Sequence, residues 1–483
     1  MAGDISSLKP ESLWKHFAEI LKIPRCSGNE KAIADYILNL ARSWSLEAQK
    51  DRVGNVVVKK PAFSGRESSP SVILQAHLDM VCEKNSDIQH DFSKDPITPY
   101  IEGDWVKAKG TTLGADNGIG IAACLAVLED KNLVHGPLEC LFTIDEETGL
   151  TGAFKLKKDI LTGKLLLNLD SEDEGTFTIG CAGGADSEIS LPVDRKKKKA
   201  KNVLVIKITG LHGGHSGLDI NLGRANALKC LARLLAEAAG KFKFELVSFN
   251  GGSKRNAIPR ESEALVAIEP ASQKALINQL KKSFAAIKFE YKVTEPDLSM
   301  AICQADSPAW PLTAESQSKL LNLLLALPHG VISMHPEIPG LVETSSNLAV
   351  VSSEEKTIKI ICNTRSSVMS ALEAVRLTIR AVSQLAGARV RQPEGYPAWT
   401  PNLQSSLLQK MINIYKNLFQ KEPEVKAVHA GLECGIIGEK YPGLDMISFG
   451  PTIKNPHSPD ERVQISSVEK FWQFLVESLL KLA

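Results

Sequence analysis

The sequence predicts an α/β protein whose main sheet is covered by helices on both faces. Short apolar stretches recur along the 483-residue chain, and their residues do not alternate with polar ones. Strands of this kind are typical of sheets buried on both faces, and helical segments separate them here. A single hydrophobic core stops growing near ~250–300 residues. We therefore expect more than one domain.

The first third of the chain predicts alternating helices and strands. Apolar residues at helical spacing open the chain, among them Trp14, Phe17 and Ile20. A glycine-rich turn precedes a later helix, and short β-rich runs lie between the helices. The expected helices cover 10–22, the segment after Gly28 and 117–129, and the expected strands cover 53–58, 72–76, 138–144 and 165–169.

A change of composition near residue 184 predicts an inserted domain. Lysines dominate the run from Asp194 to Lys201. We interpret this run as a solvated loop, because the charge is local and the chain as a whole is neutral. The pattern beyond it predicts a doubled split-βαβ unit. Its expected helices cover 223–239, 270–285 and 370–385, and its expected strands include 203–208, 263–268 and 357–362.

The residues after about 397 are too few for a comfortable domain of their own. Tyr396 to Pro401 holds two prolines and marks the boundary. We therefore expect the tail to complete the sheet that residues 1–184 begin. Its expected elements are a helix over 403–419, a strand over 446–449 and a helix from Ser466.

Composition argues against several classes of partner. The 57 Lys and Arg residues balance 56 Asp and Glu, and a net charge of +1 gives no long-range field for nucleic acid or an anionic membrane. No apolar run reaches the ~18–20 residues that span a bilayer, and the N-terminus lacks the apolar stretch of a signal peptide. Nine scattered cysteines predict no disulfide framework. We expect a cytoplasmic protein.

Potential metal ligands gather where predicted strands end. Each of them alone has an ordinary explanation as a turn, a cap or a surface residue. Together they predict a site, because the strand ends of an α/β sheet meet at the edge where ligands bind. Two histidines with several carboxylates suit zinc, cobalt or manganese. The candidates are His77 with Asp79, Asp116, the acids from Asp145 to Glu147, Asp170, and His457.

Five motifs, in this order along the chain, resemble those of the co-catalytic di-zinc exopeptidases. They are H-L-D-M from His77, G-A-D-N-G from Gly114, D-E-E-T-G from Asp145, N-L-D-S-E from Asn168 and P-H-S-P-D-E from Pro456. Within that family the chain is most similar to the PepD-type aminoacyl-histidine dipeptidases, also called cytosolic non-specific dipeptidases. The resemblance covers the whole chain. It implies a zinc-exopeptidase-like mixed sheet flanked by helices, in a catalytic domain made of 1–184 and 398–483, with an α+β lid domain inserted at 185–397.

The resemblance also implies a role for each motif residue. It implies two divalent metal ions per chain, zinc first, with cobalt or manganese able to substitute. Glu146 would be the general base that takes a proton from a metal-activated water, and Asp79 would orient His77. The implied metal ligands are His77 and Asp170 for one ion, Glu147 and His457 for the other, and Asp116 as the bridge.

Three residues of the inserted domain resemble the family's substrate-binding positions. His215 would stabilise the developing oxyanion, and Asn256 and Arg365 would hold the substrate carbonyl and carboxylate. For Arg365 the alternative is a surface charge at a strand end. The segment from Gly431 to Gly435 is a further candidate for holding the substrate's free ends. A homodimer is left open, since a doubled lid would supply the histidine within one chain.

Two other patterns fail on their context. Gly118 to Ala123 matches a variant of the dinucleotide fingerprint, but no strand precedes it. Gly214 to Gly217 resembles a serine nucleophile elbow, but Leu218 stands where the closing glycine is needed. The expected activity is hydrolysis of short peptides, including Xaa-His dipeptides such as carnosine. The alternatives are a di-zinc N-acyl amino acid deacylase or aminopeptidase, and more remotely a non-catalytic peptide-binding protein that keeps the metal.

Overall fold

The computed structural model of the protein describes residues 4–200, 202–305 and 310–483. The chain forms two compact units. The first unit comprises Met1–Gly180, Trp399–Ala427 and Leu432–Ala483, and the second unit comprises Cys181–Ala398 with Val428–Gly431. Both ends of the chain therefore belong to the first unit, and the second unit is inserted into it in sequence.

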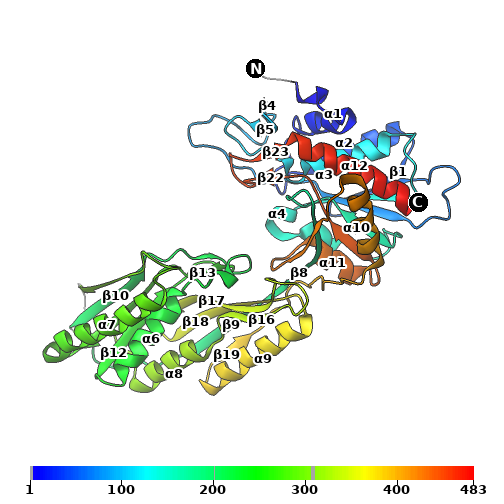
Figure 1. The fold of residues 1–483 in the computed structure, drawn as a ribbon. Coiled ribbons are helices and arrows are strands. Elements are labelled where there is room, and N and C mark those ends of the chain that lie inside the picture. The colour runs from blue at the N-terminus through cyan, green and yellow to red at the C-terminus, as the bar shows by residue number, and fades with distance from the viewer. Residues whose placement is uncertain (1–3, 201, 306–309) are drawn as a thin grey trace. The chain divides into compact units, whose positions relative to one another are not determined.

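An eight-stranded mixed sheet forms the centre of the first unit (Figure 1). Its strands lie in the order β1-β2-β6-β3-β7-β21-β8-β20. β3 pairs in parallel with β6 and β7, and β21 from the tail pairs in parallel with β7. The tail thus completes this sheet, as predicted. The strands are β1 Glu47–Lys50, β2 Val56–Lys60, β3 Val72–His77, β6 Leu138–Thr143, β7 Leu165–Asn168, β8 Thr176–Cys181, β20 Glu424–Val428 and β21 Asp445–Ser448.

Helices flank this sheet (Figure 1). Every residue of β3 and of β6 is buried, which explains why their sequences do not alternate. α3 is apolar all round and almost wholly buried, and its regular turns begin after Asn117. The helices of the first unit are α1 Glu11–Ile20, α2 Lys31–Ser43, α3 Ala115–Glu129, α4 Glu146–Gly149, α5 Thr151–Lys155, α10 Ser406–Phe419, α11 Glu433–Lys440 and α12 Ile465–Leu482, with the 3-10 turn η1 Ile5–Ser7.

A small antiparallel sheet and one disulfide complete the first unit. The sheet has the order β22-β23-β5-β4, with β4 Pro99–Glu102, β5 Trp105–Ala108, β22 Ile453–Lys454 and β23 Arg462–Gln464. The loop between β22 and β23 carries His457. The disulfide joins Cys26 to Cys82. This single bond was not predicted from the scattered cysteines.

A nine-stranded antiparallel sheet forms the centre of the second unit, and it is doubled as predicted. β10, β12, β14 and β15 lie in the spatial order β15-β10-β14-β12, and β9, β17, β18 and β19 lie in the order β17-β18-β9-β19. Numbered along the chain within each half, both orders are 4-1-3-2 when read from their outer edge. The halves meet where β12 pairs with β17. The first half is inserted between β9 and α8 of the second.

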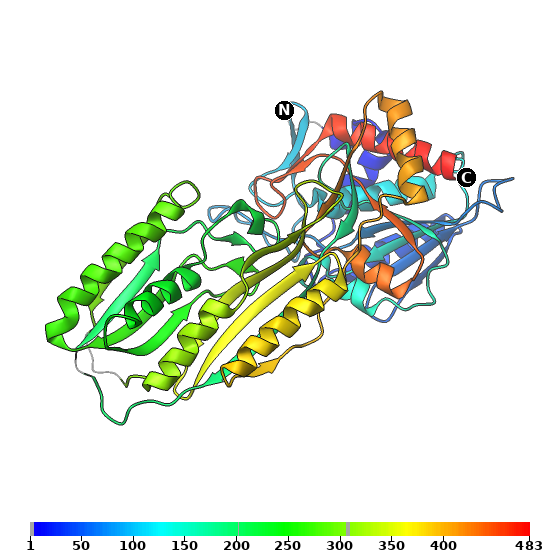
Figure 2. The same ribbon diagram turned by 60° about the horizontal axis from the view of Figure 1, so that its bottom comes forward.

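Four helices cover one face of this sheet and enclose the core of the second unit (Figures 1 and 2). They are α6 Ala227–Ala239, α7 Pro270–Glu290, α8 Ala314–Ala326 and α9 Met369–Leu385, with the 3-10 turn η2 Ile220–Leu222. The strands are β9 Gly183–Pro192, β10 Val203–Thr209, β11 Gly214–His215, β12 Phe244–Gly251, β13 Ala257–Ile258, β14 Ser262–Ile268, β15 Ser299–Gln304, β16 Gly330–Met334, β17 Val342–Ser353, β18 Thr357–Ser366 and β19 Arg389–Arg391.

The lysine-rich run lies between β9 and β10. Lys196 to Lys199 are exposed, as a solvated loop requires, and Lys201 lies outside the described residues. Among the helices that the structure describes, none has the length and apolar character needed to cross a bilayer.

Candidate functional site

His77 is the last residue of β3 and is 1% exposed. Its Nδ1 lies 3.3 Å from Asp79 Oδ1, and its Nε2 lies 3.1 Å from Asp116 Oδ1 and 3.4 Å from Asp170 Oδ1. Burial lowers the pKa of His77, but the three carboxylates outweigh burial and raise it well above its usual value. Both nitrogens of this buried imidazole therefore face negative charge.

Asp79 is fully buried, yet it is held as an anion. Its Oδ2 accepts hydrogen bonds from Ser27 Oγ at 2.7 Å and from the Glu147 N–H at 3.2 Å, and its Oδ1 accepts one from the Glu146 N–H at 3.0 Å. Burial raises the pKa of Asp79, but the His77 imidazole and these donors outweigh burial and lower it to about 2. The carboxylate thus contacts His77 and also fixes the first turn of α4.

Asp116 lies between the two imidazoles. Its Oδ1 is 3.1 Å from His77 Nε2, and its Oδ2 is 3.2 Å from His457 Nε2. Burial raises the pKa of Asp116, but His457 and His77 outweigh burial and lower it below its usual range. The two oxygens of one carboxylate therefore each contact one histidine, which is the arrangement that a shared ligand requires.

The described residues include groups whose ligand atoms are close enough to hold a divalent ion. His77, Asp116 and Asp170 form one group, and Asp116, Glu147 and His457 form another, each with its ligand atoms within 4.8 Å of one another. The two groups share Asp116. All five ligands expected from the motifs are thus brought together, from the ends of β3 and β7, the start of α3 and α4, and the loop before β23.

A buried oxygen of Glu147 indicates that the group of Asp116, Glu147 and His457 fits a metal ion. Glu147 Oε2 lies 3.0 Å from His457 Nε2. Its Oε1 is buried and makes no hydrogen bond to any part of the chain that the structure describes. A buried carboxylate oxygen without a donor or cation is costly. The donors are nitrogen and oxygen only, which suits zinc, cobalt or manganese, so these residues fit divalent metal ions.

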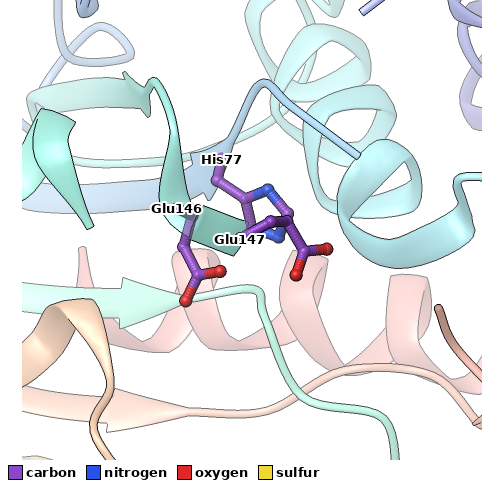
Figure 3. A group of neighbouring side chains, drawn as sticks. All are labelled: His77, Glu146 and Glu147. Carbon is purple, nitrogen blue, oxygen red and sulfur yellow. The ribbon is translucent and has the colours of Figure 1, made fainter. Parts of the chain in front are cut away.

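Glu146 precedes Glu147 at the start of α4. Together with His77 these two acids form a third group within 4.8 Å, and their side chains extend from neighbouring strand and helix ends (Figure 3). Burial raises the pKa of Glu146 well above its usual value, an effect that His77 opposes and that Asp170 and Glu433 reinforce. A carboxyl that takes up a proton this readily is suited to proton transfer.

In the second unit, β11 presents His215 as a neutral hydrogen-bond donor. The backbone N–H groups of Gly217 and Leu218 donate to His215 Nδ1 at 3.2 and 3.1 Å. Nδ1 is therefore unprotonated, and the neutral ring carries its hydrogen on Nε2. Burial lowers the pKa of His215, and the charge of Arg365 lowers it further, against the opposing effect of Asp219.

Arg365, on β18, is 6% exposed, so it is not the surface charge that the alternative reading proposed. Its Nη2 lies 3.5 Å from His215 Nε2, and its Nη1 donates to the Tyr396 hydroxyl at 2.7 Å. The Nε of Arg365 is buried and makes no hydrogen bond within the described ranges. The guanidinium therefore keeps donors available beside His215.

Asn256 is exposed in the turn before β13, and β13 pairs with β11 so that His215 stands opposite Ala257. His215 and Asn256 both line a cavity of about 1070 Å³ on the second unit, together with residues of β10, β12 and β14. The three expected substrate-binding residues thus lie near one another within this unit.

Glu433 begins α11 and is 2% exposed. Its Oε2 accepts hydrogen bonds from Gln75 Nε2 and Thr143 Oγ1, both at 2.7 Å, while its Oε1 is buried without a partner among the described residues. Burial raises the pKa of Glu433 to about 7. The segment from Gly431 to Gly435 was a candidate from the sequence, but the burial of Glu433 and its hydrogen bonds to Gln75 and Thr143 were not predicted.

Three residues that support these clusters, two buried and one partly buried, were not predicted from the sequence. Arg25 and Tyr396 belong to no motif, and each acts on groups far from it in the chain. Glu461 stood in the last motif, yet nothing in that motif gave it a role. Arg25 and Glu461 are each 2% exposed; Arg25 bonds to the turns that carry Asp79 and Asp116, and Glu461 bonds to the Asp116 turn alone.

The family model described as Peptidase family M20/M25/M40 matches residues 73–481 of this chain. The chain belongs to this peptidase family. Over 478 residues, 99% of each chain, it is 43% identical to a protein of Escherichia coli (strain K12) named cytosol non-specific dipeptidase. The fold matches that of aminoacylhistidine dipeptidase from Vibrio alginolyticus with a TM-score of 0.92 and 44% identity, covering 99% of this chain and 98% of that one.

More distant M20-like folds also match. Aminopeptidase PepT from Bacillus cereus shares the fold at 15% identity, with a TM-score of 0.58 over 98% of this chain and 99% of that one. The family inferred from the five motifs is therefore confirmed. So are the mixed α/β sheet with a separate antiparallel domain and the enzyme class, a metallopeptidase.

Proposed function

We propose that this M20 peptidase is a metal-dependent dipeptidase that hydrolyses short peptides, including Xaa-His dipeptides of the carnosine type. The observation that carries the proposal is the carboxylate of Asp116 between His77 and His457, with Glu146 beside that cluster. The relatives named as dipeptidases, which match over nearly the whole chain, support the substrate class. The word cytosol in one of those names supports a cytoplasmic location.

Two divalent ions per chain, zinc in the first place and cobalt or manganese as substitutes, are the cofactors in this proposal. When bound, they supply Lewis-acid polarisation of the peptide carbonyl and lower the pKa of a water toward ~7. His77 and Asp170 would hold one ion, Glu147 and His457 would hold the other, and Asp116 would be shared between them; these residues lie in the two groups that could hold an ion.

Glu146 moves the proton in the proposed reaction. Its carboxylate takes a proton from the attacking water and returns it to the departing amine nitrogen. The raised pKa of Glu146 suits a group that must carry that proton between two steps. Asp79 holds the backbone of Glu146 through a 3.0 Å hydrogen bond, so the base is presented in a fixed position.

In the proposed division of labour, 1–184 and 398–483 form the catalytic domain and 185–397 forms the lid. The Nε2–H of neutral His215 stabilises the oxyanion, Asn256 binds the substrate carbonyl, and Arg365 binds the C-terminal carboxylate. The buried setting of Arg365 and its unused donors support this role. Light scattering in solution decides whether a homodimer forms.

The test is a substrate panel with and without a chelator. Carnosine and Ala-His stand beside N-acetyl amino acids and aminoacyl-anilides. Chelator-sensitive cleavage of the free dipeptides is expected. Cleavage confined to the acylated compounds would instead assign an N-acyl amino acid deacylase, and cleavage of the anilides an aminopeptidase. A metal-loaded protein that cleaves nothing would return the chain to a binding role.

A further inference from the structure

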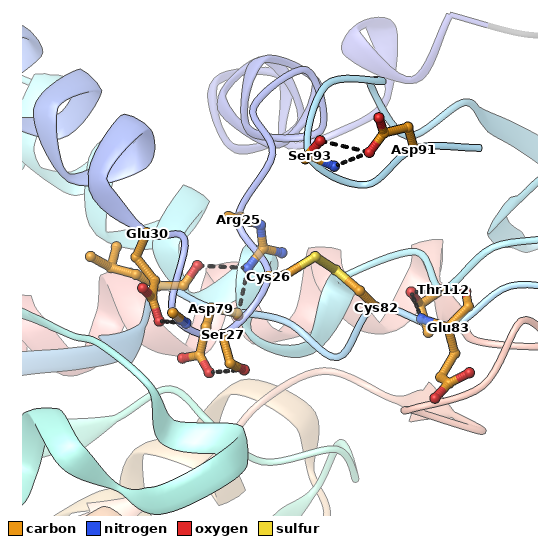
Figure 4. The surroundings of a disulfide bond; sticks show 12 residues. Arg25, Cys26, Ser27, Glu30, Asp79, Cys82, Glu83, Asp91, Ser93 and Thr112 are labelled. Carbon is orange, nitrogen blue, oxygen red and sulfur yellow. Dashed lines mark hydrogen bonds between the residues drawn. A yellow bond between two sulfur atoms is a disulfide. The ribbon is translucent and has the colours of Figure 1, made fainter.

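Arg25 is a buried arginine whose guanidinium donates hydrogen bonds to backbone carbonyl groups. It is 2% exposed, and its Nη1 donates to the carbonyl oxygens of Leu78 at 3.0 Å and of Asp79 at 2.7 Å. Its Nη2 donates to the carbonyl oxygen of Gly114. Figure 4 shows the guanidinium beside the Cys26–Cys82 disulfide, close to the hydrogen bond between Ser27 and Asp79.

Glu461 holds the other side of the same turn. Its Oε2 accepts the backbone N–H groups of Leu113 at 2.7 Å and Gly114 at 2.8 Å. Its Oε1 accepts those of Ala115 at 2.8 Å and Asp116 at 3.2 Å. Four successive amides thus converge on one carboxylate that is itself 2% exposed. The backbone of Asp116 is fixed by this contact.

Gly114 is the point where both contacts meet. Its carbonyl accepts from Arg25 and its N–H donates to Glu461. Its φ of +70° lies in the left-handed region, and a Cβ there would come within 2.7 Å of Arg25 Nη2. The turn before Asp116 therefore has a glycine where the arginine needs the space.

We propose that Arg25 and Glu461 are positioning residues for the metal centre: Arg25 clamps the turn that carries Asp116 to the turn that carries Asp79, Glu461 ties the Asp116 turn to the loop that carries His457, and so the two set the spacing of the shared ligand from His77. This inference rests on the proposed function, which identifies the cluster as a metal centre. Neither Arg25 nor Glu461 is proposed to contact substrate. Both act through backbone groups, and the positive charge of Arg25 also opposes the negative charge of the ligand carboxylates.

The number of hydrogen bonds that Glu461 accepts is an argument for this role. A glutamine offers one oxygen and an NH2 group, so it would set two donors against two backbone N–H groups. Only a carboxylate accepts all four amides. Residues that orient ligands in this way change metal affinity by about 10–100-fold when replaced.

The first unit supplies a matched control. Glu139, on β6, is 3% exposed, and its carboxylate accepts the N–H and hydroxyl of Thr162 and the N–H of Gly163. It caps a turn as Glu461 does, and it contacts none of the five candidate ligands in the described structure. Glu139→Gln therefore makes the same substitution in an equally buried cap that serves only the fold.

The experiment measures metal affinity directly, by competition of zinc against a chromophoric chelator, on the full-length wild type and on Glu461→Gln, Arg25→Lys and Glu139→Gln. The absorption spectrum of the cobalt-loaded protein reports the ligand geometry of each. Glu461→Gln and Arg25→Lys are expected to bind zinc about 10–100-fold more weakly, with an altered cobalt spectrum. Glu139→Gln is expected to bind as the wild type does, whatever its thermal stability.

Equal zinc affinity in Glu461→Gln and wild type would overturn the inference, and so would an equal loss in Glu139→Gln. If Glu461→Gln fails to fold, the zinc affinity of Arg25→Lys is compared with those of the wild type and Glu139→Gln in the same way. Dipeptide hydrolysis is measured separately on the wild type. A wild type that binds zinc and cleaves no dipeptide would refute the proposed function, while the affinities still decide the clamp.

Discussion

Arg365→Ala is predicted to remove the enzyme's preference for a free C-terminal carboxylate. The side chain is 6% exposed, and one of its amino groups is held by the Tyr396 hydroxyl at 2.7 Å. Its Nε makes no hydrogen bond to a described residue. A guanidinium fixed in this way retains the donors for a two-point contact with a carboxylate.

The size of the effect follows from those contacts. A hydrogen bond to a charged group contributes about 1.5–3 kcal/mol. Since the two contacts to one carboxylate overlap, we expect about 3 kcal/mol for the pair, which is roughly 10²-fold in kcat/KM. The loss should fall on KM, because the carboxylate lies away from the reacting carbonyl and binds equally in ground and transition states.

The assay compares Ala-His with Ala-His amide. The wild type is expected to favour the free acid by about 10²-fold, and Arg365→Ala is expected to cleave both at similar kcat/KM. Arg376→Ala is the control, since Arg376 is 6% exposed in the same unit and donates to the Pro393 carbonyl. Equal loss on both substrates, or an equal change in Arg376→Ala, would refute the role given to Arg365.

Two further predictions concern stability. Removing the metal with a chelator should abolish hydrolysis and lower Tm. An ion that binds only the native state, present at ~1,000 times its Kd, stabilises that state by about 4 kcal/mol. Added zinc should restore both hydrolysis and Tm, and an unchanged Tm in verified metal-free protein would contradict the assigned ligands. His429 is 5% exposed, and burial and the charge of Arg365 lower its pKa to about 3, against ~6.5 unfolded. As pH falls below ~6.5 the unfolded chain binds the proton first, so wild-type stability drops by up to about 1.4 kcal/mol per pH unit from this group. In urea unfolding, the difference in free energy of unfolding between wild type and His429→Gln should therefore become smaller from pH 7 to pH 5. A constant difference would count against a neutral His429.

The parts of the fold that the sequence predicted best are those whose burial is uniform. β3 and β6 are buried along their whole length, so their apolar runs could be recognised without alternation. The helix expected from residue 117 begins its regular turns one residue later, after Asp116 and Asn117, whose backbone is non-helical. The motif residues at these element ends were predictable because their chemistry is local to a strand end.

What the sequence could not predict depends on contacts between distant segments. Arg25 bonds to three backbone carbonyls, and carbonyls leave no trace in the residue types that carry them. The doubling of the second unit was predicted, but not that its first half interrupts the second between β9 and α8, because β9 pairs with strands that lie far from it in the chain. Residues 428–431 pack with the second unit although the segments before and after them belong to the first.

The central claim is that Glu146 acts as the general base and so gives the metal-binding cluster its peptidase activity. One variant tests this role directly. Glu146→Gln keeps the shape of the side chain and the backbone hydrogen bond to Asp79 but removes the base. Its kcat on Ala-His should fall by roughly 10²–10⁴-fold while its metal content stays that of the wild type, two ions per chain in our proposal. A fully loaded variant with wild-type kcat would contradict the account.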